Sequence, residues 1–355
     1  MESLQRTVLF DAHVAAGGRM VPFAGWEMPV QYGGVIPEVK AVREGCGVFD
    51  VSHMARFAAR GENVGAALNS LVCSDWAATP NNSAAYSLLL NENGGAIDDI
   101  MGYHVNGEHW DIVSNASRVN EVEAHLRAHL PASIELQNRT ARTAMLAIQG
   151  PRAFEILSAH GNLPHPMVWR NYLKAELFGV EGQLARGGYT GSDGFEFIFP
   201  AERAVEVWEN LLKAGVTPCG LGARDVLRLE AGLPLYGHEL REAWTPAESG
   251  AGWAFKPDKG EFIGRQAAMR EPSQRIIALQ MQGKAIPREG YPITVNGEII
   301  GEITSGTMSP TVGAGIALAA SKVPFAVGDS VDVMVRDKAQ SARVVKKPFV
   351  AHVRG

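Results

Sequence analysis

Short apolar runs separated by turn residues predict a succession of β-strands in the middle of the chain. Residues 84–90 form one such run, and residues 100–105 form another, which Asn106-Gly107 turns back into residues 109–113. An Asn-Gly pair between two apolar runs is the strongest short hairpin signal. Residues 144–148 and 195–199 have the same character. We therefore expect at least one small sheet here.

Helical spacing of apolar residues recurs between these strands. Val122, Leu126 and Leu130 are spaced by four, so they share one face of a helix. The segments predicted to be helical are residues 4–16, 38–45, 64–71, 120–130, 152–160, 201–214 and 226–232. Strands and helices thus alternate, which predicts a domain that contains both helices and strands.

The pattern changes beyond residue 261. Short β-rich runs separated by turns follow, at residues 275–282, 292–304, 315–320, 331–336 and 342–348. These runs predict a separate C-terminal antiparallel β-barrel or sandwich. Within them, residues 303–310 (Ile-Thr-Ser-Gly-Thr-Met-Ser-Pro) are unusual enough to predict a loop that faces another domain.

Composition narrows the class of protein. The 355 residues suffice for two or three domains, and 46% hydrophobic content with a net charge of -5 lacks the basic excess of a nucleic-acid binder. No apolar run approaches the roughly 18 residues of a membrane span, and no signal peptide is evident at the start. The three cysteines are distant from one another, which favours a reducing compartment. A cytoplasmic location is expected, with no nucleic-acid or membrane partner.

Two adjacent carboxylates, Asp98 and Asp99, follow the Gly94-Gly95 turn and lead into the predicted strand at residues 100–105. Neighbouring side chains on a strand point to opposite faces, so only one of the two aspartates can look into a given cavity. The alternative is that both simply complete a polar turn, because Asp is a favoured turn residue.

Glu196 and Arg224 are the other candidate binding residues. Glu196 lies on the strand face opposite Phe195 and Phe197, and a carboxylate in so apolar a strand needs a partner unless that face is exposed. Arg224 is expected at a helix start, after Gly220 and Gly222, which would let a ligand approach closely. A dinucleotide loop is disfavoured because the third glycine is missing.

Three further segments have an ordinary structural explanation. Residues 20–32 carry Phe, Trp, Met and Tyr around two prolines, and they could line either a pocket or the core. His53 follows a predicted buried strand, and a satisfied structural histidine is expected there. His125 and His129 are spaced like metal ligands but lack a third ligand, so they are expected to face solvent and no metal site is predicted.

Taken together, six blocks in order resemble the aminomethyltransferase (T-protein) family of the glycine cleavage system. They are Phe-Ala-Gly-Trp-Glu-Met-Pro at residues 23–29, Phe-Asp-Val-Ser-His-Met at 49–54, Ile-Asp-Asp at 97–99, Gly-Tyr-Thr-Gly at 188–191, Gly-Leu-Gly-Ala-Arg-Asp at 220–225 with Arg-Leu-Glu-Ala-Gly at 228–232, and residues 303–311. The sequence departs from the family at His238 and Arg241, where relatives usually have Gln and an acid.

The resemblance implies a fold and a set of site residues. The implied fold class is α+β, a three-lobed cloverleaf around a folate site with a C-terminal antiparallel β-barrel. Its lobes would be residues 1–55 and 140–260 as a discontinuous first lobe, residues 56–139 as the second and residues 261–355 as the C-terminal β-barrel lobe. Asp99 corresponds to the catalytic aspartate and Glu196 to the glutamate that contacts the pterin. Positions resembling the rest of the folate pocket are Met54, Tyr86, Tyr103, Asn115, Tyr189, Arg224 and Tyr236.

The resemblance also implies a reaction. An aminomethyl group carried on the dihydrolipoyl arm of the H-protein, the partner, would transfer its methylene to tetrahydrofolate, the co-substrate, with release of ammonia and without a metal. The alternatives within the same fold are a tetrahydrofolate-dependent demethylase and a non-enzymatic folate-binding protein. The latter branch carries a Lys-Gly-Cys-Tyr loop that this sequence lacks.

Overall fold

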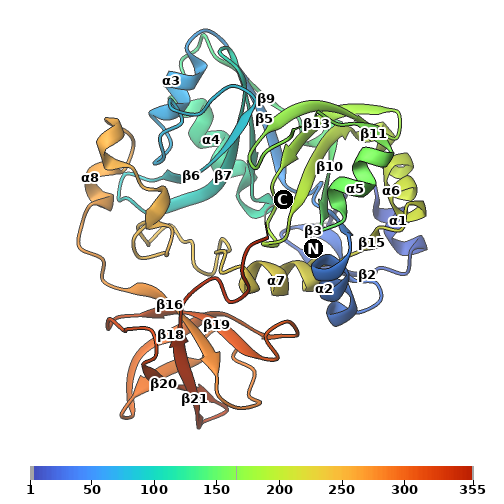
Figure 1. The fold of residues 1–355 in the computed structure, drawn as a ribbon. Coiled ribbons are helices and arrows are strands. Elements are labelled where there is room, and N and C mark those ends of the chain that lie inside the picture. Colours follow the sequence, from blue (N-terminus) through green and yellow to red (C-terminus); the bar gives the residue numbers. More distant parts are fainter. Residues whose placement is uncertain (1–3, 165, 354–355) are drawn as a thin grey trace.

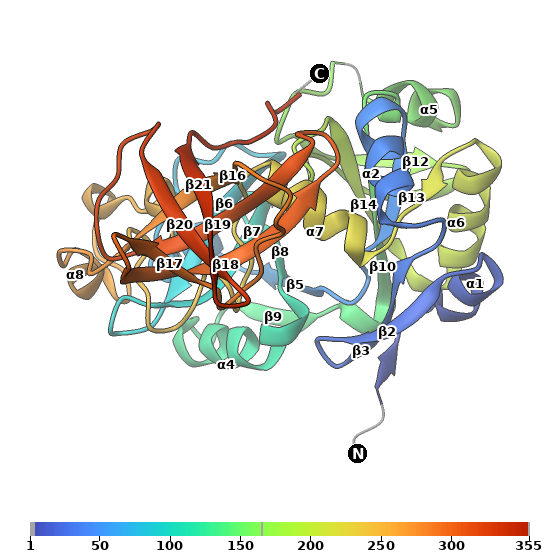
Figure 2. The ribbon, with the colours of Figure 1, turned by 90° about the horizontal axis from the view of Figure 1, so that it is seen from below.

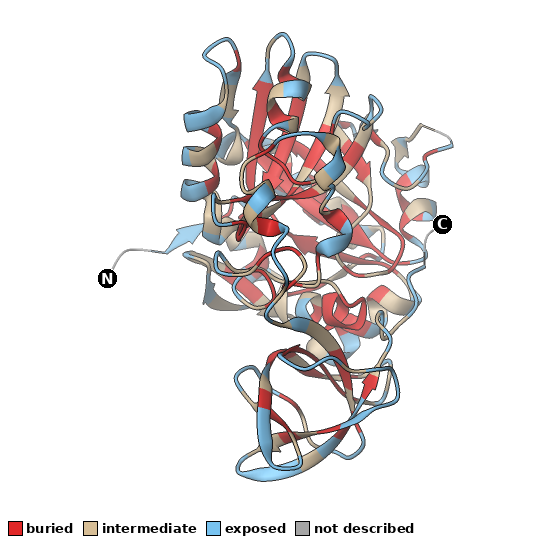
Figure 3. Ribbon diagram, turned by 90° about the vertical axis from the view of Figure 1, so that its left-hand side faces the viewer, coloured by how far each residue is buried: buried red, intermediate tan, exposed pale blue. Residues whose placement is uncertain are grey.

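The chain folds into two sheet-containing lobes and a β-barrel that meet around a central helix, α7 (Leu221–Glu230) (Figure 1). The computed structural model describes residues 4–164 and 166–353. Seen from below, α7 lies between the barrel and the first sheet (Figure 2). Buried residues gather in the sheets and in α7, and exposed ones lie on loops and outer helix turns (Figure 3). The predicted α+β class with a C-terminal barrel is confirmed.

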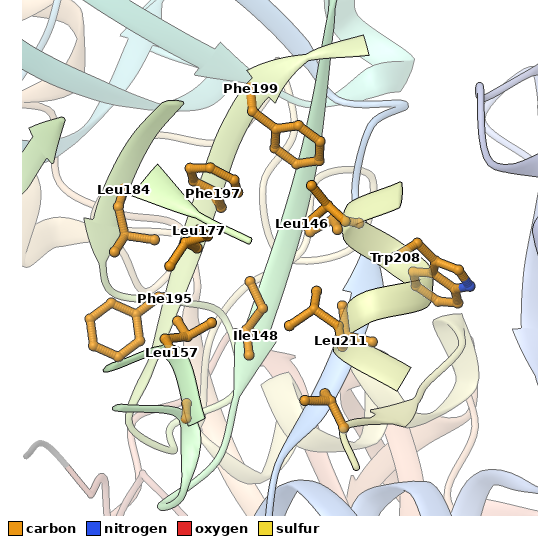
Figure 4. Packing of buried hydrophobic residues seen from close by; sticks show 14 of the residues in the cluster. Leu146, Ile148, Leu157, Leu177, Leu184, Phe195, Phe197, Phe199, Trp208 and Leu211 are labelled. Carbon is orange, nitrogen blue, oxygen red and sulfur yellow. The ribbon is translucent and has the colours of Figure 1, made fainter. Parts of the chain in front are cut away.

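The first sheet has seven strands in the order β11-β12-β13-β14-β10-β4-β15. Phe195, Phe197 and Phe199 alternate along β14 and pack with Leu146 and other apolar residues beneath two helices (Figure 4). Glu196 consequently points to the other face. The elements are β4 (Gly47–Asp50), β10 (Thr143–Gln149), β11 (Gly161–Asn162), β12 (Tyr172–Leu177), β13 (Val180–Arg186), β14 (Gly194–Pro200), β15 (Thr217–Pro218), α5 (Ala153–Ala159) and α6 (Ala204–Lys213).

The second sheet has five strands in the order β6-β7-β8-β5-β9. The hairpin predicted at Asn106-Gly107 joins β7 to β8, and the two strands pair antiparallel from Ile100 and Ser114 to Asn106 and His109. Its core contains Trp76 stacked on Trp110, with ring centroids 4.9 Å apart.

The elements of the second lobe are β5 (Ala55–Arg60), β6 (Ser83–Leu90), β7 (Ala96–Asn106), β8 (His109–Ser114), β9 (Glu135–Asn138), α3 (Val64–Asn69) and α4 (Val119–His129).

The N-terminal segment differs from the prediction of a helix over residues 4–16. A short strand, β1 (Gln5–Arg6), pairs with β3 (Trp26–Gln31), and the helix α1 covers only Phe10–Ala15. Residues 20–32, for which no element was predicted, form most of a hairpin of β2 (Arg19–Phe23) and β3. The helix expected from residue 38 is α2 (Val35–Glu44), since Pro37 is tolerated in a first helical turn.

The C-terminal strands close into a barrel because β16 pairs with both β19 and β21. The prediction of a loop at residues 303–310 is wrong, because β18 runs through Ser309 and pairs with β19 along this stretch. The elements are α8 (Arg265–Ala268), β16 (Arg275–Met281), β17 (Pro292–Val295), β18 (Glu298–Ser309), β19 (Ala314–Ser321), β20 (Ser330–Val335) and β21 (Lys338–Val345).

The same stretch of β18 does face another part of the molecule. Ser305 Oγ accepts a hydrogen bond from Arg228 of α7 at 2.8 Å, and Ser309 Oγ donates to Glu230 of α7 at 2.5 Å. Thr304 Oγ1 donates to Glu239 at 2.5 Å. The barrel is therefore joined to the central helix by buried, paired polar groups.

The last described residues return from the barrel to the centre of the molecule. Val350 N donates to the carbonyl of Glu230, and Val353 N donates to that of Gly191. No helix in residues 4–164 or 166–353 is long and apolar enough to cross a bilayer.

Candidate functional site

A cavity of about 1150 Å³ lies where the three parts of the molecule meet. Strands of both sheets, helix α7, the start of the C-terminal tail and strand β18 all contribute to its wall. Every site residue predicted from the sequence lines it: Met54, Tyr86, Asp99, Tyr103, Asn115, Tyr189, Glu196, Arg224 and Tyr236. The tertiary structure thus brings together residues that are far apart in the chain.

Asp98 and Asp99 lie within β7, so the alternative that both merely complete a turn is wrong. Asp99 lines the cavity, whereas Asp98 is fully buried on the other strand face. Asn115 bridges them, because its Nδ2 donates to Asp98 Oδ1 and to Asp99 Oδ1, each at 2.7 Å. Asn115 N also donates to Asp98 Oδ2 at 3.0 Å. Asp98 therefore anchors the amide that orients Asp99.

Burial raises the pKa of Asp99 to about 6, although the hydrogen bond from Asn115 and the nearby Tyr86 hydroxyl oppose that shift. The same burial, together with the Asp99 carboxylate, raises the pKa of Asp98. The Tyr86 hydroxyl is buried without a hydrogen-bond partner of standard geometry in the described chain. With a pKa of about 6, Asp99 is mostly ionised at neutral pH and remains a usable proton acceptor.

Glu196 and Arg224 face the cavity from β14 and α7. Tyr103 donates its hydroxyl hydrogen to Glu196 Oε2 at 3.2 Å. Burial raises the pKa of Glu196, and Arg224 and Tyr103 oppose this rise. Arg224 Nη1 is buried without a hydrogen-bond partner among the described residues. The two groups therefore present unused donors and acceptors to a ligand.

The start of α7 places Arg224 differently from the expectation. The helix begins at Leu221, five residues before the predicted start at residue 226, so Arg224 is the fourth helical residue. Its guanidinium lies over the ring of Tyr189, 5.0 Å from the centroid. Gly220 and Gly222 are needed for packing as well, because a Cβ at either would meet Val30 or Val35 at less than 3.0 Å.

The remaining predicted residues form aromatic and apolar walls. Tyr189 donates its hydroxyl hydrogen to the carbonyl of Pro234, and Tyr236 donates to that of Ala96 at 3.3 Å. Met54 is half-buried in the turn after β4. Flat apolar walls with a few charged groups are typical of sites for ring-containing small molecules.

His53 departs from the expectation of a satisfied structural histidine. It lines the cavity, and its Nδ1 is buried without a hydrogen-bond partner in the described part of the chain. Burial lowers its pKa to about 4, so the ring is neutral at pH 7. Nothing in the local sequence distinguishes this histidine from a satisfied one. Trp253, Lys347 and His352, which also line the cavity, were not predicted at all.

The paired histidines of α4 remain outside the site. His129 is exposed, as expected, whereas His125 is half-buried, so the expectation that both face solvent holds for His129 only. Among the residues that the structure describes, no group of three or more His, Cys, Asp and Glu side chains could hold a metal ion. The absence of a metal requirement stays a prediction.

Comparison with known proteins identifies the family to which this arrangement belongs. Residues 9–259 match the GCVT N-terminal domain, and residues 274–351 match the glycine cleavage T-protein C-terminal barrel domain. An aminomethyltransferase of Deinococcus deserti is 45% identical over 98% of this chain and 97% of its own. The chain belongs to the glycine cleavage T-protein family. The family, fold and aminomethyltransferase class predicted from the sequence are thereby confirmed.

Further T-protein relatives agree over the same length. An aminomethyltransferase of Symbiobacterium thermophilum is 43% identical over 98% of both chains. The crystal structure of the glycine cleavage system aminomethyltransferase T from Bartonella henselae superposes with a TM-score of 0.94 at 31% identity, covering 99% of each chain. The resemblance therefore extends to the relative placement of the lobes.

Of the two departures from the T-protein pattern, His238 lies at the cavity and Arg241 lies behind it. His238 lines it, and its Nδ1 lies 3.0 Å from the carbonyl of Thr304 and 3.3 Å from Glu289 of the barrel lobe. Arg241 Nε donates to the carbonyl of His238 at 2.8 Å. These residues thus join the rim to the barrel.

Proposed function

We propose that this T-protein transfers the methylene of an aminomethyl group, held on the dihydrolipoyl arm of the H-protein, to tetrahydrofolate. In this reaction the carbon loses its bonds to the carrier sulfur and to the amine, and it forms bonds to two folate nitrogens. Each of the two folate nitrogens loses one proton. One of these protons completes the thiol of the carrier, and the other completes the ammonia that is released. The reaction needs no oxidant.

One observation carries the proposal: Glu196, Arg224 and Asp99 share one cavity while their polar groups are incompletely paired. A pterin ring offers adjacent N–H donors that a carboxylate can accept together, and a carbonyl that a guanidinium can meet. Glu196 and Arg224 supply those two groups in the same cavity, and the tyrosine side chains of its wall would cover the faces of the ring. The described residues therefore fit tetrahydrofolate.

Asp99 is proposed as the catalytic residue. Its carboxylate, oriented by Asn115, would accept a hydrogen bond from a reacting nitrogen and favour loss of the proton as that nitrogen attacks the carbon. No covalent enzyme intermediate is required, so positioning and electrostatic stabilisation supply most of the rate enhancement. The remaining predicted residues, Met54, Tyr86, Tyr103, Tyr189 and Tyr236, would hold the folate.

The division into lobes and the cellular location complete the proposal. The seven-stranded sheet draws strands from residues 47–50 and 143–218, which supports a first lobe of residues 1–55 and 140–260. The five-stranded sheet supports a second lobe of residues 56–139, and the barrel a third of residues 261–355. Cys46, Cys73 and Cys219 are all free and buried, which favours the cytoplasm.

The test is an assay of folate products with defined donors. Aminomethyl-loaded H-protein should yield methylene-tetrahydrofolate and ammonia, whereas methyl donors such as sulfonium or O-methyl compounds should yield no folate product. Calorimetry should show binding of reduced folate to the enzyme alone. Product formed from a methyl donor, with none formed from the loaded H-protein, would overturn the proposal in favour of a demethylase.

A further inference from the structure

The Lys347 side chain places a positive charge at the cavity with few partners of its own. It lies in the tail that follows β21, is half-buried and lines the cavity. Among the described residues, its ammonium makes no salt bridge and donates one hydrogen bond, to the carbonyl of Gly250 at 3.4 Å. An ammonium has three donors, and most N–H···O bonds are about 2.7–3.2 Å long. Lys347 therefore has donors to offer to a ligand.

The acid whose charge acts on Lys347 is already paired. Burial lowers the pKa of the Lys347 ammonium, and the charge of Glu239 opposes that shift. Glu239, however, is fully buried and accepts hydrogen bonds from Arg228 at 3.2 Å and from Thr304 at 2.5 Å. Because removing a cation from water costs free energy, an anionic ligand beside Lys347 would recover part of that cost.

Lys347 lies beyond the end of α7, away from the groups that fit the pterin ring. It packs on the backbone at Gly232, where an added Cβ would meet the Lys347 Cβ at 3.0 Å. Gly232 follows Arg224 by eight residues along and just past α7, and a helix rises 1.5 Å per residue, so about 12 Å separates the two positions. The aminobenzoyl group of folate separates the pterin ring from the glutamate by a distance of this order.

The ammonium also lies on the side of the cavity to which folate extends past Asp99. An added Cβ at Gly250 would meet Lys347 Nζ at 3.2 Å. Gly250 comes three residues before Trp253, whose indole stacks on Tyr86 with the ring centroids 5.0 Å apart. Tyr86 lies beside Asp99 on the neighbouring strand. A folate whose reacting nitrogens lie at Asp99 would therefore run along these two rings and bring its glutamate towards Lys347.

We propose that the Lys347 ammonium binds a carboxylate of the glutamate end of tetrahydrofolate and so selects folates over pterins that lack this acidic end. The inference rests on the proposed function and adds a contact to its folate site. A hydrogen bond between an ammonium and a carboxylate is stronger than one between neutral groups. The aminomethyl donor ends in an amine that is protonated at neutral pH and that Lys347 would repel, so this charge suits folate and not the donor.

The experiment measures the Kd of tetrahydrofolate by calorimetry for the wild-type enzyme, Lys347→Met and Lys347→Arg. Lys347→Met keeps an unbranched side chain and removes the charge. The Kd should therefore rise roughly 5- to 30-fold, as expected for the loss of one charge-assisted hydrogen bond at a half-buried site. Lys347→Arg keeps the charge and should retain most of the affinity. Turnover at saturating tetrahydrofolate should stay unchanged in both variants, because Asp99 is untouched.

A second ligand separates recognition of the acidic end from a general effect on the cavity. In the diamide of tetrahydrofolate, neutral amides replace both glutamyl carboxylates, and the pterin and aminobenzoyl groups are kept. The wild-type enzyme should bind this diamide more weakly than tetrahydrofolate, and Lys347→Met should bind it as tightly as the wild type does. The matched control is Lys346→Met, which removes the charge of an exposed neighbouring lysine outside the cavity lining and should bind tetrahydrofolate like the wild type.

Three results would overturn the inference: an unchanged Kd of tetrahydrofolate in Lys347→Met, an equal rise for tetrahydrofolate and its diamide in that variant, or equal affinities of the wild-type enzyme for the two ligands. The third comparison needs no variant, so it decides the question even where melting temperatures show that Lys347→Met is unfolded. In each case a wild-type enzyme that forms product from the loaded H-protein leaves the proposed function standing. A wild-type enzyme that binds no reduced folate would overturn the proposed function and this inference together.

Discussion

Two arginines one turn apart on α7 differ in how completely they are hydrogen-bonded: Arg228 lies at the interface between the lobes and Arg224 lies at the cavity. Arg228, 2% exposed, donates to Asp225, Glu239, Ser305 and the carbonyl of Leu233. Arg224 has a buried Nη1 without a partner among the described residues. Burying a donor of a charged group without a hydrogen-bond partner costs free energy, and we expect a ligand in the cavity to supply the partner of this one.

Two buried glutamates, Glu230 at the interface and Glu196 at the cavity, differ in the same way. Glu230 is fully buried and is paired with Arg43 at 2.7 Å and with Ser309 at 2.5 Å. Within the part of the chain that the structure describes, Glu196 accepts a single side-chain hydrogen bond, from Tyr103. At the interface between the lobes, the buried charged groups therefore have their hydrogen-bond partners, whereas at the cavity some of them do not. Substitutions at the interface should change stability, and those in the cavity should change binding or turnover.

The largest effect is expected from Asp99→Asn, which keeps the shape of the side chain and removes its charge. Turnover at saturating tetrahydrofolate should fall by about 10²–10⁴, as is usual for acid–base groups. Folate affinity and melting temperature should change little. Steady-state kinetics with loaded H-protein provide the measurement.

The matched control is Glu289→Gln, which removes a carboxylate from the exposed rim of the same cavity and should change turnover little. Near-native turnover in Asp99→Asn, with folate bound, would contradict the proposed role of Asp99. Asp98 is unsuitable as a mild control, because it is fully buried and bonded to Asn115, so Asp98→Asn should lower the melting temperature.

Next in size is Glu230→Ala at the interface. It removes the carboxylate that pairs with Arg43 and accepts the hydrogen bond from Ser309, and breaking a buried ion pair typically costs about 3–5 kcal/mol of stability. Denaturant or thermal unfolding should reveal this loss. Glu206→Ala is the control, because its pair with Arg203 is exposed and contributes only about 0–1 kcal/mol. Equal effects of the two substitutions would refute the contrast between interface and surface pairs.

Arg224→Ala tests whether this residue of α7 contributes to folate binding and not to the stability of the fold. Affinity for tetrahydrofolate should fall by about 1.5–3 kcal/mol, the value of a hydrogen bond to a charged group, and Glu196→Ala should have a similar effect. The melting temperature without folate should fall only slightly in Arg224→Ala, because Nη1 makes no hydrogen bond to the described residues and the contact with the Tyr189 ring is worth about 0.5–1 kcal/mol. Calorimetry and thermal unfolding test both halves of this expectation. Marked destabilisation with unchanged affinity would mean that Arg224 is structural.

The smallest expected effect is a pH dependence from Asp99. Because its folded pKa, about 6, exceeds the ordinary value near 4, the native protein binds more protons than the unfolded chain between those values. This group's contribution to stability therefore decreases as pH rises from about 4 to about 6. The melting temperature of Asp99→Asn, relative to wild type, should rise over that range.

Activity should show the opposite trend over the same pH range. If ionised Asp99 is the active form, turnover of the wild-type enzyme should increase as pH rises through about 6, and Asp99→Asn should lack that limb. A pH–rate profile at saturating substrates measures it. An identical limb in both proteins would assign the titration to another group.

The sequence by itself determined much of the local structure. Alternation placed Phe195 and Phe197 in the core and Glu196 on the opposite face, and the same rule separated Asp98 from Asp99. The Asn106-Gly107 turn was predicted correctly. These features depend on neighbouring residues alone, because side-chain direction in a strand has a period of two.

Boundaries set by distant partners were predicted less well. Residues 303–309 look like a polar loop, but their hydroxyl groups are satisfied by Arg228, Glu230 and Glu239, so the stretch can remain a strand. The start of α7 was also missed, because Gly220 and Gly222 pack against Val30 of the N-terminal hairpin. Local propensity is overridden wherever such tertiary contacts are available.

Only the tertiary structure decided which polar groups lack partners. His53 looked like a satisfied histidine, and Trp253 carried no signal in the pattern, yet both line the cavity with Asp99, Glu196 and Arg224. Hydrophobic periodicity reports which side chains are buried, but a missing hydrogen-bond partner depends on every segment that reaches the same point in space. The site therefore emerges where the three lobes meet, and no single segment contains it.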